Sequence, residues 1–210
     1  LPLATVASNL VTYDTATGQL LDSNGLVSNK LAIVSEQPPS ALTGDSAVVD
    51  GHGRYKVTST GYVGANYPYH IFSKIETDAW ISATDTYSAT DGTYAGSGSL
   101  GGVSGEWVKL ELPYKTTLRH FTLRHDTDGT NEGQRKQFPV DFKVVASNDD
   151  INWTTLNATT GVSMPGTTAL TTTARTFVVD DITSYKFYAI VVEKITSGAN
   201  FNRCQIGEWR

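Results

Sequence analysis

Hydrophobic and polar residues alternate along residues 105–125, GEWVKLELPYKTTLRHFTLRH. In the first half, Val108, Leu110 and Leu112 fall on one face of an extended chain, and the residues between them fall on the other. This period of two is typical of a strand with one side packed against a core. Pro113 has no N–H to donate, so we expect it to stop the hydrogen-bond ladder at a short turn, and we interpret the segment as a hairpin.

The same alternation recurs farther along the chain. Phe121 and Leu123 share one face of a second run, residues 118–124, and a polar, glycine-containing segment separates it from a third run, residues 139–147. Residues 185–194 are apolar on both faces, which indicates a central strand that is buried on both sides. Further strands are expected at residues 55–59, at Trp153, at 175–179 and across CQIGEW, residues 204–209. Eight or more strands with irregular loops predict an all-β jelly-roll sandwich.

Composition narrows the classes of function. The 210 residues suffice for one β-sandwich with a small appendage. The net charge of −5, with Arg135-Lys136 as the only dense basic spot, argues against a nucleic-acid partner. Cys204 is the single cysteine, so no internal disulfide holds the fold. No apolar run approaches the roughly 20 residues of a membrane span, so we expect no membrane insertion, and no signal-peptide pattern opens the chain.

The sequence pattern of residues 1–36 differs from that of the rest of the chain. Short β-prone runs alternate there with the turn signals Thr17-Gly18 and Asn24-Gly25. A hairpin, the last repeat of a fibrous β shaft and a plain linker are three open interpretations. Consecutive prolines, Pro38 and Pro39, then make a stiff junction. We therefore predict an N-terminal β segment, residues 1–36, and a head domain, residues 37–210.

Motifs of known enzyme classes are missing from the sequence. The four histidines lack metal-binding spacing, and no G-x-S-x-G nucleophile elbow occurs. The run DTDGTN, residues 126–131, carries oxygen ligands, but its glycine comes too early for an EF-hand loop. We expect a protein without catalytic residues.

Several stretches together resemble the discoidin domain, also called the coagulation-factor type C domain. They are the spacing of eight from Phe72 to Trp80 and the runs GEWVKLELP, FKVVASNDDINWTTL, YKFYAIVVEKI and QIGEWR. The resemblance covers residues 37–210 and is strongest to the version found in large DNA viruses of algae and protists. The earlier run VTYDTATGQLLDS is similar to segments that precede such domains in viral fibre proteins. The resemblance implies an eight-stranded jelly roll whose loops at one end bind a ligand, commonly a sugar.

The resemblance also implies candidate sugar-binding residues. The family's arginine, asparagine and C-terminal aromatic match Arg124, Asn131 and Phe201, which supply planar hydrogen bonds and a stacking face. A histidine that many sugar-binding members carry after the tryptophan is missing here, and His125, Tyr87 or Tyr94 could substitute for it. In the alternative interpretation, Arg124 pairs with Asp126 or Asp128 and Phe201 packs in the core.

A structural calcium is the one cofactor that the resemblance implies. In many relatives an F-D-G run, a threonine and a glutamate of the final strand help to ring the ion, and the matching positions are Phe72-Ser73-Lys74, Asp78 and Glu208. Asp78 and Glu208 would supply charged oxygens. Lys74 could instead neutralise Glu208 and replace the metal.

These observations predict the glycan-binding head of a virion surface fibre, which attaches to a host cell-surface glycan. Alternatives are a carbohydrate-binding module of a secreted or surface enzyme, and a capsid decoration domain without a ligand. Apolar residues of the N-terminal segment need burial that one strand-turn-strand segment cannot provide. We expect them to pack against sister chains in a homotrimer, the number three coming from the resemblance to fibre shafts: Leu10, Val11, Leu20, Leu21, Leu26, Val27, Leu31, Ile33 and Val34.

Overall fold

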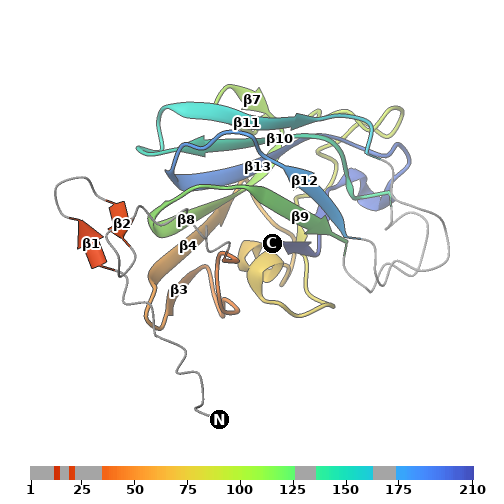
Figure 1. The fold of residues 1–210 in the computed structure, drawn as a ribbon. Helices are drawn as coiled ribbons and strands as arrows, with labels where there is room; N and C mark the ends of the chain where they lie inside the picture. The colour runs from red at the N-terminus through yellow and green to blue at the C-terminus, as the bar shows by residue number, and fades with distance from the viewer. Residues whose placement is uncertain (1–11, 15–18, 22–34, 126–135, 163–173) are drawn as a thin grey trace, which may run out of the picture. The chain divides into compact units, whose positions relative to one another are not determined.

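A computed structural model describes residues 12–14, 19–21, 35–125, 136–162 and 174–210 (Figure 1). The chain divides into two compact units, Leu1–Ser35 and Glu36–Arg210. The Gln37–Pro38 peptide bond, next to the start of the second unit, is cis. No helix within these described ranges is long and apolar enough to cross a membrane.

The first unit contains a short antiparallel pair of strands. Strand β1 (Thr12–Asp14) pairs with β2 (Gln19–Leu21), with Thr12 opposite Leu21. The hairpin therefore brackets the turn signal Thr17-Gly18. The second signal, Asn24-Gly25, and most of the apolar residues proposed to contact sister chains lie outside the described residues.

The second unit is a β-sandwich of antiparallel strands, which confirms the predicted fold class. Its larger sheet has six strands in the order β11-β10-β13-β8-β4-β3, and a smaller sheet has the order β12-β9-β15 (Figure 1). The larger sheet consists of β3 (Ser46–Val49), β4 (Gly53–Ser59), β8 (Glu106–Thr116), β10 (Pro139–Ser147), β11 (Trp153–Thr159) and β13 (Tyr185–Ile195). The smaller consists of β9 (His120–Arg124), β12 (Arg175–Val178) and β15 (Glu208–Trp209).

Short elements complete the unit between these strands. They are η1 (Pro68–Phe72), β5 (Trp80–Ile81), β6 (Ser99–Leu100), β7 (Val103–Ser104), η3 (Asn200–Asn202) and β14 (Gln205–Ile206). Strand β5 pairs with β14, and β6 pairs with β7. The predicted final strand CQIGEW is thus split between two sheets, with Gly207 between β14 and β15.

The hydrophobic alternation correctly predicts which residues form the core. Val108, Leu110 and Leu112 of β8 are buried, and so are Phe121 and Leu123 of β9. Burying each such side chain stabilises the fold by roughly 1.5–3 kcal/mol. The central strand predicted at residues 185–194 is also confirmed, because β13 lies between β10 and β8.

The hairpin predicted for residues 105–125 is wrong. Strand β8 pairs with β13 and β4, whereas β9 pairs with β12 and β15, so the two strands lie in different sheets. Pro113 does not end the strand, because β8 continues to Thr116. The register with β13 jumps from Glu111 to Thr116 at this point, so no ladder bond is needed from the proline.

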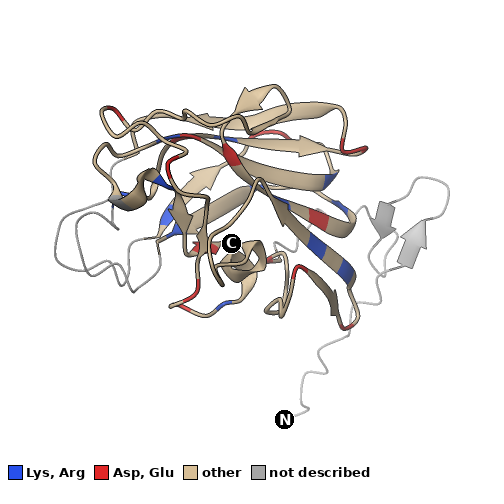
Figure 2. Ribbon diagram, turned by 180° about the vertical axis from the view of Figure 1, so that it is seen from behind, with Lys and Arg blue, Asp and Glu red and all other residues tan. Residues whose placement is uncertain are grey.

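The face of the larger sheet that points away from the smaller one is only partly covered. Around Trp107 and Trp153, next to the β6–β7 turn, a second and smaller apolar cluster forms. A Cβ added at Gly101 in this turn would lie 2.7 Å from Cβ of Trp153, so the close approach requires glycine. Away from this cluster the face is polar, and Figure 2 shows basic and acidic residues together on neighbouring strands.

Candidate functional site

Phe201 is the predicted sugar-binding residue that lies open to solvent. Its side chain is 62% exposed in η3, so the alternative of core packing is excluded. Asn131, its predicted partner, lies outside the described residues.

Arg124 does not have the exposure that its predicted role requires. It lies on β9 opposite Glu208 of β15, is only 7% exposed, and donates from Nε to Oε2 of Glu208 at 3.0 Å. A guanidinium group held inside the sheet cannot donate to the ring hydroxyls of a sugar at the surface. The structure thus corrects this prediction to a structural ion pair, whereas Asp126 and Asp128, its expected partners, lie outside the described residues.

Of the three residues that could substitute for the missing histidine, His125 and Tyr87 lie in the core, and Tyr94 is half-buried against it. His125 is fully buried, and its ring centroid lies 6.3 Å from that of Phe138. Tyr87 is buried and donates its hydroxyl to the carbonyl oxygen of Val192 at 3.1 Å. Tyr94 packs edge-on against Tyr87, with 5.4 Å between ring centroids, and its hydroxyl accepts the N–H of Gly98 at 2.7 Å. Burial excludes His125 and Tyr87 from stacking on a sugar, and Tyr94 is held against the core by its contacts with Tyr87 and Gly98.

Two loops are joined beneath Phe201. The N–H of Asp85 donates to the carbonyl oxygen of Phe201 at 2.9 Å, and the N–H groups of Thr86 and Tyr87 both donate to the carbonyl oxygen of Asn202 at 3.1 Å. The Asn202 amide also donates to Oδ1 of Asp85 at 3.4 Å. These bonds hold the exposed ring on a defined backbone.

The backbone of this junction is strained. Asp85, Phe201 and Asn202 have φ values of 58°, 57° and 43°, and they are three of the five non-glycine residues with positive φ among those described. Each such conformation costs about 1 kcal/mol or more and persists only where the surroundings impose it. Strain of this kind clusters at binding sites, so it marks the junction as a functional candidate.

Arg203 completes the site and was missed by the sequence interpretation. Its Cζ lies 4.7 Å from the centroid of the Phe201 ring, and burial lowers the pKa of its guanidinium. Its Nε is buried without a hydrogen-bond partner, and no carboxylate within the described ranges forms an ion pair with it. The spacing of two residues from Phe201 was a possible signal, but the unpaired charge is visible only in three dimensions.

The Phe201 site, defined here as Asp85, Phe201, Asn202 and Arg203, combines two chemistries. The exposed ring can stack on the C–H face of a sugar, and the arginine and amide can donate to hydroxyl groups, while the carboxylate can accept from them. This is the donor and stacking set that the resemblance ascribed to Arg124, Asn131 and Phe201, formed by partly different residues.

Glu208 does not fit the predicted calcium site. Its Oε2 accepts from Arg124, and its Oε1 accepts from Nε and Nη2 of Arg210 at 2.7 and 2.6 Å. Both oxygens that would face a cation therefore bind guanidinium groups. The described residues contain no group of three or more His, Cys, Asp or Glu that could hold a metal, and half-buried Asp78 is not part of one.

The suggestion that Lys74 neutralises Glu208 is corrected as well. Lys74 pairs instead with Glu36, at 3.1 Å, and donates to the carbonyl oxygen of Pro39 at 3.0 Å. Glu36 also lies 3.8 Å from Arg210. The result is an ionic chain, a term used below for the linked residues Lys74, Glu36, Arg210, Glu208 and Arg124.

Comparisons with known proteins identify the fold. No protein-family profile matches the chain, and no curated protein matches its sequence. Solved structures from Clostridium perfringens do match. One, the family 32 carbohydrate-binding module of NanJ in complex with galactose, has a TM-score of 0.50 and 12% identity over 74% of this chain and 90% of that one.

Two further structures from the same organism agree. The module CBM32-3 of a family 31 glycoside hydrolase has a TM-score of 0.53 and 15% identity, over 72% of this chain and 85% of that one. A module solved with GalNAc-β-1,3-galactose has a TM-score of 0.51 and 12% identity, over 74% of this chain and 92% of that one. The chain has a discoidin-like fold. In this discoidin-like sandwich, the Phe201 site lies on loops, whereas the ionic chain includes Arg124 of β9 and Glu208 of β15.

Proposed function

We propose that the unit Glu36–Arg210 is a carbohydrate-binding module without catalytic activity, and that the Phe201 site holds the sugar. The observation that carries the proposal is an exposed aromatic ring stacked on a half-buried arginine that has no acidic partner. An unpaired cation with a buried, unsatisfied donor is costly to maintain in a folded protein. A ligand that accepts hydrogen bonds from the exposed part of this half-buried side chain would pair the charge.

The structural neighbours suggest which sugars to test first. Two of them were solved with galactose and with GalNAc-β-1,3-galactose. Identities of 12% support the fold alone, so the ligand class rests on the geometry at Phe201. We expect a dissociation constant of about 10 μM to 1 mM per site, because an exposed site on loops buries few contacts. Several units acting together would raise the avidity.

A glycan array first identifies which sugars bind. Titration calorimetry then measures the dissociation constants of galactose, N-acetylgalactosamine and any further ligand from the array. Phe201→Ala and Arg203→Ala should each weaken binding about tenfold or more, since each removes one of the two chemistries. The matched control is Ile151→Ala, which trims an apolar side chain that is 79% exposed in another loop. Undiminished binding by both site variants, or no binding to any glycan, contradicts the proposal.

A more specific proposal concerns the kind of protein to which the module belongs. The resemblance of residues 1–36 to the end of a fibre shaft supports the head of a virion surface fibre, which binds a host cell-surface glycan as a homotrimer. A module attached to an enzyme is the second candidate, because one structural neighbour belongs to a glycoside hydrolase.

Light scattering separates these two settings. The fibre proposal expects a trimer of the full chain and a monomer of a shortened chain that begins at Glu36. A monomeric full chain would contradict the trimer, and a trimeric shortened chain would place the contact in the head.

A further inference from the structure

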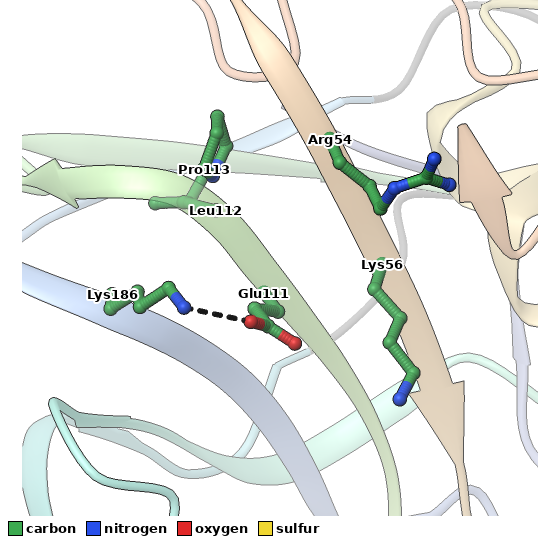
Figure 3. A pocket seen from close by; sticks show the side chains of 6 residues that line it. All are labelled: Arg54, Lys56, Glu111, Leu112, Pro113 and Lys186. Carbon is green, nitrogen blue, oxygen red and sulfur yellow. Dashed lines mark hydrogen bonds and ion pairs between the residues drawn. The ribbon is translucent and has the colours of Figure 1, made fainter. Parts of the chain in front are cut away.

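A second polar feature lies away from the Phe201 loops, on the open face of the six-stranded sheet. It is a cleft of about 290 Å³ between β4, β8 and β13. Figure 3 shows the side chains that line it: Arg54, Lys56, Glu111, Leu112, Pro113 and Lys186. The alternation in β4 explains its polarity, because Tyr55 and Val57 are buried in the core and the residues between and before them point outward.

The cleft carries an excess of positive charge. Three cations line it against the single carboxylate of Glu111, although the whole chain has a net charge of −5. Lys186 donates from Nζ to Oε1 of Glu111 at 2.9 Å. Arg54 donates from Nη1 to the Ser46 hydroxyl at 3.0 Å. Lys56 is exposed and has no hydrogen-bond or ion-pair partner in the part of the chain that the structure describes, although it lies opposite Glu111 in the β4–β8 register.

An aromatic ring continues this surface along β13. Phe187 is half-buried beside the cleft, and Nζ of Lys186 and of Lys109 lie 5.4 and 5.9 Å from its ring centroid. Lys109 pairs with Asp150 at 2.7 Å and Lys186 with Glu111 at 2.9 Å, so the charges without an acidic partner among the described residues are those of Arg54 and Lys56. The face thus offers an apolar ring next to cations that are not fully paired.

We propose that this cleft is a second binding site, which takes an anionic group, sulfate or carboxylate, on a sugar of an acidic polysaccharide. Arg54 offers a planar pair of donors and the two lysines offer ammonium groups, a combination that suits oxyanions. The volume lies near the lower end for ligand sites, about 300 Å³, which suits one charged sugar rather than a long segment. Electrostatic attraction here does not depend on the Phe201 site, so the inference stands apart from the function proposed above.

The test is affinity electrophoresis of the full chain through gels that contain dextran sulfate, polygalacturonate or neutral dextran. The wild type should be retarded by at least one charged polymer and not by neutral dextran. Lys56→Ala combined with Lys186→Ala should weaken the retardation about tenfold, since each exposed charge pair contributes up to ~1 kcal/mol. The matched control is Lys115→Ala with Arg119→Ala, which removes the same charge from exposed residues outside the cleft.

The outcomes separate the sources of the anion. Loss of retardation by both charged polymers supports a site for either oxyanion, and loss by dextran sulfate alone supports a sulfate site. Equal losses in the cleft variant and the control variant overturn the proposal, because they indicate a general attraction. The absence of retardation of the wild type by either charged polymer overturns it too.

Phe201→Ala distinguishes the two sites. Retardation that survives in this variant supports a separate anion site, even if neutral sugars do not bind to the chain at all. Retardation lost in Phe201→Ala places the anion in the loops and overturns the proposal. Unchanged melting temperatures show that each variant is folded.

Discussion

Arg124 and Arg203 both place a guanidinium group in partly apolar surroundings, but only one of them has an acidic partner. Arg124 lies within the smaller sheet, at the end of the ionic chain, and pairs with Glu208. Arg203 lies in a strained loop, with the exposed ring of Phe201 over it and no carboxylate in contact among the described residues. Each guanidinium keeps one buried nitrogen without a hydrogen-bond partner, Nη1 of Arg124 and Nε of Arg203, so the acidic partner is what distinguishes the two.

The difference shows that the family pattern matched an arginine that is held in an ion pair. Residue type is the same at both positions, so the pattern cannot tell a paired cation from an unpaired one. The deciding facts are distance and burial, which depend on strands far apart in the sequence. A binding arginine is therefore better recognised by a missing partner than by its place in a motif.

The largest expected difference is in the free energy of unfolding, when each of the two arginines is replaced with methionine. Methionine keeps much of the side chain's length but removes the charge. Arg124→Met leaves Glu208 buried with one cation fewer, so we expect a loss of about 3 kcal/mol in the free energy of unfolding. Arg203→Met removes an unpaired charge, so its change should stay within about 1 kcal/mol while sugar binding is lost. Urea denaturation of both variants measures the two changes. Equal stability of the two variants would contradict the division of roles.

Phe201→Gly should separate stability from binding inside the loop. Glycine adopts a φ of 57° without strain, so we expect a gain of up to about 1 kcal/mol in the free energy of unfolding. Removal of the ring should abolish stacking, so binding is lost. Phe201→Ala is the control, because it also loses the ring but keeps the strain. If Phe201→Gly is no more stable than Phe201→Ala, the loop is not under the strain inferred here.

Much of the sandwich could be predicted from local pattern, and less of its pairing. The alternation of Val108, Leu110 and Leu112 identifies the buried face of β8, because a strand against one core must alternate. The same pattern fits a strand in either sheet, so it could not show that β8 and β9 separate. Pairing depends on contacts distant in sequence, which alternation does not encode.

The candidate site likewise depends on contacts between residues that are distant in the sequence. The family resemblance matched Phe201 to an aromatic near the C-terminus, and the structure places this side chain in the open. Arg203 was missed because its importance depends on the absence of an acid nearby. The family resemblance matched Glu208 to a metal ligand, yet Arg124, 84 residues earlier in the chain, binds it.

Glu106 is a second buried carboxylate, and unlike Glu208 it can be tested through the pH dependence of stability. Glu106 is buried and forms no ion pair within the part of the chain that the structure describes, and burial raises its pKa above the usual 4.5, although Thr60 and Tyr94 donate hydrogen bonds to it. A raised pKa in the folded state adds stability at low pH that is lost as pH rises through the folded pKa. We therefore expect the stability of wild type relative to Glu106→Gln to fall as the pH rises above the usual pKa of 4.5. Urea denaturation at a series of pH values measures it, and a difference that is flat or rises with pH would contradict the assignment.

The smallest effect is expected from calcium, and it tests whether the ionic chain has taken the place of a metal site. Calcium binds oxygen ligands, and those of Glu208 are occupied by N–H donors of Arg124 and Arg210. A ligand stabilises a folded protein only if the folded state binds it, so neither excess calcium nor EDTA should move the melting temperature. Calcium should begin to matter only if the competing cations are removed, as in Arg124→Met combined with Arg210→Met. A wild-type melting temperature that falls in EDTA and recovers with calcium would show that the guanidinium groups do not exclude the ion, and would return Asp78 and Glu208 to the predicted role.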